Sequence, residues 1–229
     1  MRRFVLGGPE LAGFAIDAPA ASVRLLLPRS DGTLEMPEWT GNQFELADGA
    51  RAPIRTFTPR LFDPDTLELT IEIVRHGTGA ASDWAESASV GDEVAISGPG
   101  RGYEIDTTAA GYLLAGDETA LPAISQLLEA LPASMPVRVI IEVVGESARL
   151  DLPTHEHAEV TWHQLPEGDE PGTAMLDAIV SLDEVPPAVW VAGEAAAIQK
   201  IRSHLFGERE LARSAATVRG YWKQGRSAT

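Results

Sequence analysis

Residues 55 to 60 bring together cations, an aromatic ring and hydroxyl groups in one short segment, Arg55-Thr56-Phe57-Thr58-Pro59-Arg60. In an extended chain alternate side chains share a face, so Arg55 and Phe57 point one way and the threonines the other. An arginine can hold a pyrophosphate, an aromatic side chain can stack on a flat ring, and a threonine hydroxyl can bond a ring nitrogen. Pro59 indicates a strand edge or end, where a ligand can approach. These properties fit a flat, phosphate-bearing ligand, although spacing alone favours an ordinary hairpin strand with surface arginines.

A second candidate lies where a strand is expected to give way to a helix. The strand end Val74-Arg75-His76-Gly77 is followed by the small residues of Gly79-Ala80-Ala81-Ser82 and then by Trp84. Small residues before a helix leave backbone N–H groups open to an anionic phosphate. Ser82 is alternatively an ordinary N-cap residue.

Two further candidates follow apolar runs in the second half of the chain, Gly116-Asp117-Glu118-Thr119 and Gly193-Glu194. Each is expected at the carboxyl edge of a parallel sheet, which is where such sheets bind ligands. Thr119 is expected to be the N-cap of the following helix. The first segment lacks the G-x-G-x-x-G dinucleotide fingerprint, so by itself it is a weak nucleotide signal.

Basic and aromatic residues gather near the C-terminus, where Gly220-Tyr221-Trp222-Lys223 follows a series of cations. The basic residues are Lys200, Arg202, Arg209, Arg213, Arg219, Lys223 and Arg226. They form either a local cationic site or the solvated face of a helix. The two aromatic residues are alternatively the end of a strand that packs on the core.

The evidence for a metal site or for a hydrolytic site is weak. His155-Glu156-His157 and the nearby His163 offer zinc-ligand types, but alternate positions on a strand or loop rarely make a closed site without a fourth ligand, so no metal site is expected. The absence of a G-x-S-x-G motif argues against hydrolysis by a serine nucleophile. No catalytic side chain is therefore assigned.

The elements that must position these residues change character along the chain. Short apolar bursts between about Val23 and Tyr103, alternating with period two in Leu67 to Val74, predict an antiparallel β-barrel or sandwich. Later strand-like runs at 112–115, 137–144 and 188–192 alternate with helical stretches at 121–131, 174–182 and 195–206, which predicts a parallel α/β sheet. We expect two domains, residues 1–106 and 107–229.

Composition narrows the class of protein. The 229 residues carry a formal net charge of −16, which argues against a nucleic-acid partner because phosphate binding relies on clustered cations. No apolar run approaches the roughly 20 residues needed to span a bilayer, and the N-terminal segment does not have the pattern of a signal peptide. The chain has no cysteine, so redox chemistry requires a bound organic cofactor or a metal site of another kind. These features fit a cytoplasmic protein.

The order of the segments is more informative than any one of them. The arginine-rich strand, the His-Gly strand end, the Gly-x-x-Ser-x-Trp-Ala helix start and Gly91-Asp92-Glu93-Val94-Ala95-Ile96-Ser97-Gly98-Pro99 succeed one another. They are followed by Ala115-Gly116-Asp117-Glu118-Thr119-Ala120-Leu121-Pro122-Ala123-Ile124, Val189-Trp190-Val191-Ala192-Gly193-Glu194 and Arg219-Gly220-Tyr221-Trp222-Lys223-Gln224-Gly225. In this order the chain resembles, over nearly its whole length, the siderophore-interacting proteins, FAD-binding ferric-siderophore reductases of the ferredoxin-reductase superfamily.

The resemblance implies a ferredoxin-reductase-like fold and a role for each segment. A flavin-binding barrel would hold FAD, with Arg55 on the pyrophosphate, Phe57 against the isoalloxazine and Thr58 near its N5 edge, and Thr56 belongs to the same segment. The remaining cofactor residues would be Val74, His76, Ala81, Ser82, Trp84, Gly116, Asp117, Glu118, Thr119, Gly193, Glu194 and Trp222. Arg219, Lys223 and Arg226 would attract an anionic ferric chelate.

The implied reaction passes electrons from NADH or NADPH, or from a ferredoxin, through FAD to Fe(III) in a ferric siderophore. The acids at 117 and 118 favour NADH slightly. The alternatives are a general NAD(P)H–flavin reductase, or reductase partner of an oxygenase, and a non-enzymatic iron-chelate carrier. Relatives usually have Tyr where this chain has Phe57, and begin with an additional strand, so we expect weaker FAD retention or two chains that complete each other.

Overall fold

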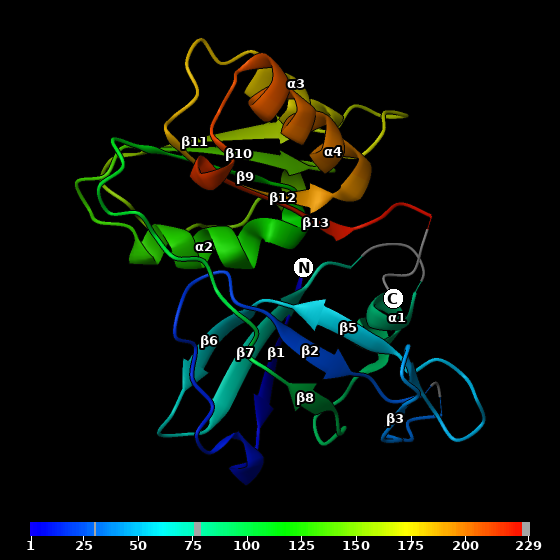
Figure 1. Ribbon diagram of the computed structural model, residues 1–229. Helices are drawn as coiled ribbons and strands as arrows, with labels where there is room; N and C mark the ends of the chain where they lie inside the picture. Colours follow the sequence, from blue (N-terminus) through cyan, green and yellow to red (C-terminus); the bar gives the residue numbers. More distant parts are fainter. Residues whose placement is uncertain (30, 76–78, 226–229) are drawn as a thin grey trace. The chain divides into compact units, whose positions relative to one another are not determined.

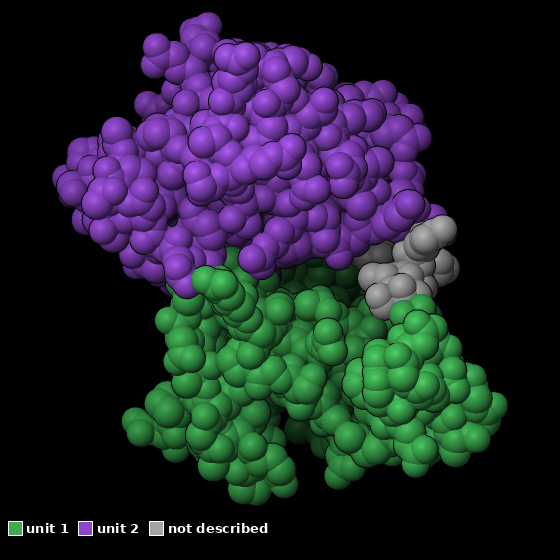
Figure 2. Space-filling view, viewed as in Figure 1, with its two compact units in different colours: residues 1–102, 227–229 green, residues 103–226 purple. Residues whose placement is uncertain are grey.

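The computed structural model describes residues 1–29, 31–75 and 79–225. The chain divides into two compact units, Met1–Gly102 (unit 1) and Tyr103–Arg226 (unit 2), which are coloured separately in Figure 2. Figure 1 gives the labels of the helices and strands. Among the described residues, no helix is both long and apolar enough to cross a membrane.

Unit 1 is built from short antiparallel strands and one helix. Its elements are β1 (Arg2–Gly7), η1 (Pro9–Leu11), β2 (Val23–Leu26), β3 (Glu38–Trp39), β4 (Phe44–Glu45), β5 (Ile54–Phe57), β6 (Pro59–Asp63), β7 (Glu68–Ile73), α1 (Ala80–Ser87) and β8 (Ala95–Ser97). Two three-stranded sheets have the orders β1-β7-β6 and β5-β2-β8, and β3 pairs with β4.

Both three-stranded sheets enclose one apolar core. Leu69, Ile71 and Ile73 alternate inward along β7, and they meet Leu25 of β2 and Trp84 of α1. The period-two pattern therefore places its apolar face as predicted, because alternate side chains of a strand point to opposite faces. One face of helix α1, with Trp84 and Ala85, belongs to this core.

Unit 2 is a five-stranded parallel sheet with helices on both faces. Its elements are β9 (Tyr112–Gly116), η2 (Glu118–Ala120), α2 (Leu121–Ala130), β10 (Val137–Val143), η3 (Glu146–Ala148), β11 (Ala158–Gln164), α3 (Thr173–Val180), β12 (Ala188–Glu194), α4 (Ala195–Ser203), the π-helical turn η4 (His204–Glu208), η5 (Arg213–Ala215) and β13 (Ala216–Trp222). Figure 1 shows α3 and α4 on one face of the sheet and α2 on the other.

The strand order β11-β10-β9-β12-β13 places the first strand of unit 2 at the centre. From β9 the chain builds outward to β10 and β11 on one side, then returns to add β12 and β13 on the other, so the order reverses between β9 and β12. Parallel sheets bind ligands at such a reversal, beyond the carboxyl ends of the strands. The three helices expected in this half are present, although the last changes to a π-helical turn after Ser203 rather than continuing as an α-helix to Phe206.

Candidate functional site

The guanidinium of Arg55 has no acidic partner among the described residues. Arg55 lies on β5 opposite the buried Leu25, and its recorded hydrogen bond is from Nη1 to the carbonyl of Ile54, at 2.9 Å. Partial burial holds the pKa of Arg55 below its usual value, and the neighbouring Arg51 cation adds to this effect. A half-buried cation without a counterion fits an anionic group such as the pyrophosphate of FAD.

The other residues of the segment differ in exposure. Phe57 is half-buried and packs against the core of unit 1, while Thr56 is exposed on the outer face. Thr58 is only 7% exposed. Its hydroxyl can both donate and accept a hydrogen bond, so Thr58 also fits a polar ligand group.

Within the described residues, no side chain caps the start of helix α1. Its N-cap residue is Gly79, and the first intrahelical bond within the described residues runs from Asp83 N–H to the carbonyl of Gly79, at 2.9 Å. Ser82 is buried in the first turn, so the alternative that Ser82 is an ordinary N-cap is wrong. Ala81 is half-buried beside it. The helix start therefore has backbone N–H groups that no described side chain caps, and such groups can bind an anion.

Trp84 packs behind this helix start. Its ring stacks on Phe4 of β1 at a centroid distance of 4.5 Å, and its buried Nε1 has no hydrogen-bond partner among the described residues. Val74 is half-buried after β7, whereas His76 lies outside the described residues.

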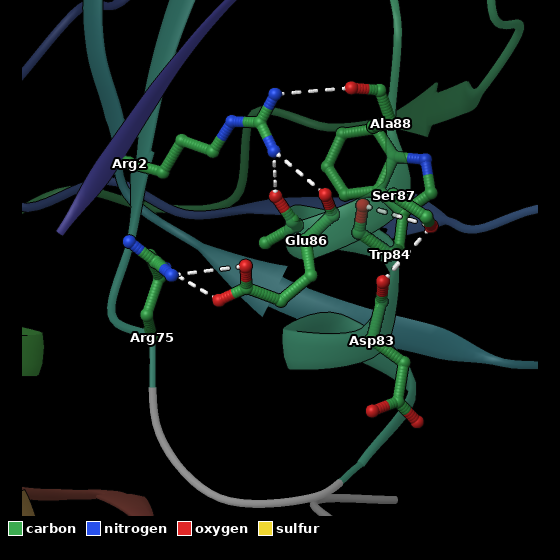
Figure 3. Close-up of polar contacts among 8 residues, drawn as sticks. Arg2, Arg75, Asp83, Trp84, Glu86, Ser87 and Ala88 are labelled. Atoms are coloured by element: carbon green, nitrogen blue, oxygen red, sulfur yellow. Dashed lines mark hydrogen bonds and ion pairs between the residues drawn. The ribbon is translucent and has the colours of Figure 1, made fainter.

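Two arginines tie α1 to the strands of unit 1 (Figure 3). Arg2 of β1 donates to the carbonyl of Ala85, and to those of Glu86 at 3.1 Å and Ala88 at 3.0 Å. Arg75 donates to both carboxylate oxygens of Glu86, at 2.5 and 2.9 Å. Because the last carbonyls of a helix lack intrahelical donors, Arg2 satisfies groups that would otherwise need water.

Replacing Arg2 with alanine is expected to lower the free energy of unfolding by about 1–3 kcal/mol, because charge-assisted hydrogen bonds at the helix end are lost. The matched control is Arg3→Ala, which removes the exposed partner of Glu72 and leaves α1 untouched; it should cost less than Arg2→Ala, about 1 kcal/mol. Denaturant unfolding measures both variants. Equal losses would show that the helix-end contacts contribute nothing specific.

In unit 2, Asp117 rather than Thr119 is the N-cap of the helical segment after β9. The Oδ1 atom of Asp117 accepts from the backbone N–H and the hydroxyl of Thr119, at 2.9 and 2.5 Å. The prediction that Thr119 is the N-cap is therefore wrong, because the strand ends at Gly116 and the next residue takes the cap position. Glu118 accepts from the N–H of Val144 at 2.8 Å, which joins this turn to the end of β10.

Carboxylates from the strands also occupy the starts of α3 and α4. Glu142 accepts from the N–H groups of Gly172 and Met175, at 2.5 and 3.0 Å, and Glu194 accepts from Ala196 and Ala197, at 2.5 and 3.0 Å. Sequence reasoning missed Glu142, although an acid inside the apolar strand Val137–Val143 is a signal in itself. Each carboxylate satisfies N–H groups at its helix start in the way a bound anion would.

Burial raises the pKa of both Asp117 and Glu142, and the Asp117 charge contributes further to the rise at Glu142. Two glycines allow this close packing: a Cβ on Gly116 would lie 2.4 Å from the Cβ of Ala120, and one on Gly193 would lie 2.7 Å from Oδ2 of Asp117. The predicted segments 116–119 and 193–194 therefore meet at one acidic edge. The backbone N–H groups at the starts of α3 and α4 already donate to these carboxylates. They are therefore not available to bind the pyrophosphate of a nicotinamide dinucleotide.

The basic residues near the C-terminus divide into two groups. Arg202 and Arg209 donate to backbone carbonyls, among them that of Val218, and Arg213 lies over the ring of Phe206. Arg219 and Lys223 are exposed at the end of β13. Arg226 lies outside the described residues. The indole Nε1 of Trp222 donates to Oδ2 of Asp117 at 2.7 Å, which brings the C-terminal segment to the acidic edge.

The histidines considered for zinc have partners of other kinds. Nε2 of His155 lies 3.1 Å from the carbonyl of Pro132, and Nε2 of His163 lies 3.1 Å from the hydroxyl of Thr161. No group of three or more candidate metal-ligating side chains is found in the described part of the chain.

Comparison with known proteins identifies the family and the fold. Residues 1–103 match the siderophore-interacting FAD-binding domain, and residues 109–225 match the siderophore-interacting protein family. A siderophore utilization protein from T. fusca superposes with a TM-score of 0.86 at 35% identity, covering 99% of this chain and 88% of that one. A ferredoxin reductase of carbazole 1,9a-dioxygenase, at 15% identity and a TM-score of 0.64, covers 89% of this chain and 61% of its own, and shares the fold alone.

Two curated relatives carry functional names. The ferric vibriobactin reductase ViuB of Vibrio cholerae is 28% identical over 98% of this chain and 84% of its own length. The NADPH-dependent ferric-chelate reductase of Escherichia coli is 27% identical over 96% of this chain and 86% of its own. The predicted barrel plus parallel-sheet fold of ferredoxin-reductase type is confirmed, and this chain belongs to the siderophore-interacting protein family, with an FAD-binding domain in its first half.

Proposed function

We propose that this chain is an FAD-dependent reductase of ferric siderophores, which passes electrons from NAD(P)H, or from a reduced ferredoxin, to Fe(III) and releases Fe(II). The single observation that carries the proposal is the half-buried Arg55, a cation without an acidic partner among the described residues, in the unit that matches the siderophore-interacting FAD-binding domain. Two relatives named as ferric reductases support the same reaction class. The proposed place of the reaction is the cytoplasm.

The residues of unit 1 fit FAD. Arg55 would hold the pyrophosphate, Thr58 would bond the polar edge of the flavin ring, and Phe57 would contact the ring with its exposed side. Ala81 and Ser82 at the uncapped start of α1 would meet the phosphates, with Trp84 behind them; Thr56, Val74 and His76 complete the proposed set. A bound flavin supplies the ability to accept two electrons together and to return them singly.

The donor is proposed to approach the acidic edge of unit 2. Gly116, Asp117, Glu118, Thr119, Gly193 and Glu194 border this edge, and Trp222 is attached to it. Because the N–H groups that the carboxylates hold cannot also support phosphates, and because the edge is acidic, NADH is the favoured dinucleotide over NADPH with its additional 2′-phosphate.

The test begins with an absorbance spectrum of the purified protein after incubation with FAD, before and after NADH or NADPH is added without oxygen. We expect a flavin spectrum that bleaches with the donor and recovers when a ferric siderophore is added. A protein that takes up no flavin would overturn the proposal. Bleaching that ferric siderophores do not reverse would favour a general flavin reductase, and ferric-chelate binding without flavin would favour a carrier.

Replacing Lys223 with alanine is expected to slow the reduction of an anionic ferric siderophore about two- to fivefold, because an exposed cation attracts an anionic substrate in a strongly acidic protein. Reduction of a neutral quinone should not change. Lys200→Ala removes the same charge from the exposed face of α4 and is the control. Steady-state rates at low and high salt measure the effect, and an equal loss with both acceptors would contradict a cationic substrate site at Lys223, Arg219 and Arg226.

A further inference from the structure

An irregularity in the last strand sets the position of Trp222. Between β12 and β13 the register pairs Gly193 with Gly220 but Glu194 with Trp222, so Tyr221 is an extra residue on β13. An extra residue of this kind changes the face to which the following side chains point. Tyr221 packs edge-on against Trp190 at a centroid distance of 6.1 Å, and the indole N–H of Trp222 is directed to Asp117 instead.

Asp117 is well placed to hold this ring. Its side chain is 7% exposed, and its Oδ2 atom accepts both from Trp222 Nε1 at 2.7 Å and from the backbone N–H of Glu194 at 2.9 Å. Its other oxygen is held by Thr119. Hydrogen bonds to an ionised carboxylate are shorter and stronger than neutral ones, and burial makes the loss of such a bond costly.

The backbone beyond Trp222 is fixed at a second point. The N–H of Gln224 donates to Oε1 of Glu194 at 3.2 Å, while the other oxygen of Glu194 caps α4. Gly193 contributes by having no side chain, since a Cβ there would lie 2.7 Å from the carboxylate oxygen that Trp222 uses. The contacts of Trp222 and Gln224 therefore connect this segment to the ends of β9 and β12, where a parallel sheet takes its ligand.

We propose that Asp117 is a positioning residue that holds the indole of Trp222 at the carboxyl edge of unit 2, where the ring forms one wall for the nicotinamide ring of a bound dinucleotide. This inference rests on the proposed function, because it assigns the wall to the proposed donor. Asp117 itself does not touch the dinucleotide. Trp222 supplies the flat surface, and Asp117 keeps that surface in one orientation.

The first measurement reports on the indole alone. In protein labelled with ¹⁵N, the Trp222 indole resonance is identified by its loss in Trp222→Phe. We expect it to lie downfield of the other indole resonances and to exchange slowly with solvent, and to move toward the position of a free indole in Asp117→Asn. Trp190→Phe is the matched control, because the Trp190 N–H has no partner among the described residues. An unchanged Trp222 resonance in Asp117→Asn would overturn the positioning role.

The second measurement is the dissociation constant for NADH, from energy transfer between tryptophan and the bound nicotinamide or from calorimetry. We expect Trp222→Ala and Asp117→Asn each to weaken NADH binding about tenfold, which is the upper range for one aromatic contact. The double variant should bind no more weakly than Trp222→Ala. Independent losses that multiply would show that Asp117 acts by some other route.

The outcomes separate this inference from the proposed function. Wild-type protein that takes up FAD but does not bind NADH would overturn the dinucleotide donor, and with it the wall assigned to Trp222. Binding of NADH that is insensitive to both substitutions would overturn the inference and leave the proposed function standing. If Asp117→Asn does not fold, Trp222→Phe still removes the hydrogen bond while keeping a ring, and an unaltered affinity for NADH would then count against the positioning role.

Discussion

Replacing Arg55 with alanine is expected to give a protein that purifies colourless and binds FAD about 10- to 100-fold more weakly. In the wild type the half-buried guanidinium has no acidic partner in the described part of unit 1, so a bound anion would offset the cost of its burial. Loss of a hydrogen bond to a charged group costs about 1.5–3 kcal/mol, which corresponds to that range of affinity. Quenching of flavin fluorescence on titration of FAD measures the dissociation constant.

The controls separate charge from placement. Arg24→Ala removes the same charge from the neighbouring strand β2, where the side chain lies on the exposed face, and should leave FAD affinity unchanged. Arg55→Lys keeps the charge but loses the paired N–H geometry, so its affinity should fall between those of wild type and Arg55→Ala. If all three variants retain the wild-type affinity, Arg55 does not hold the cofactor.

Replacing Gly172 with alanine is expected to destabilise unit 2 by about 2–5 kcal/mol, the largest effect on stability that we predict. Gly172 has a φ of 86°, which L-residues rarely adopt, and a Cβ there would lie 2.2 Å from the Cβ of Ala197 on α4. The same residue donates its N–H to Glu142, so a shift of the backbone also breaks a buried hydrogen bond. Thermal or denaturant unfolding gives the loss directly.

Gly168→Ala is the matched control for this substitution. Gly168 has a similar φ of 89°, but nothing lies within 4 Å of the Cβ that alanine would add. Its loss should be only the conformational cost of about 1–2 kcal/mol. The difference between the two variants measures the steric overlap, and losses of equal size would exclude the close approach of α3 to α4 as the cause.

The sequence was most informative where a pattern is local. Alternation along β7 predicted its inward face, and uninterrupted apolar runs predicted the buried strands β9, β10 and β12, because the period of a buried face is set within a few residues. The order of the segments then identified the family. The roles of Arg55, Thr58 and the other cofactor residues remain predictions, because neither the fold nor the family comparison tests them.

The details of the acidic edge depend on contacts that no local pattern encodes. Asp117 and Thr119 are both acceptable N-cap residues, and the choice of Asp117 accompanies hydrogen bonds from Glu194 and Trp222, which are 77 and 105 positions away. Glu142 reaches N–H groups about thirty positions further on. The extra residue at Tyr221 likewise shows only in the pairing of β12 with β13. Contacts between residues so far apart in the sequence cannot be predicted from the spacing of residues within a motif.

The capping of α3 and α4 by acids from β10 and β12 also bears on how unit 2 moves. A helix usually frays from both ends, but here opening of either first turn would leave a strand carboxylate without its donors. Amide exchange should therefore be slow at these helix starts and faster at the opposite ends. We therefore expect the carboxyl edge of the sheet to be the more rigid side of unit 2. The thermal fluctuations of α3 and α4 should be largest at their C-terminal ends, away from the proposed site.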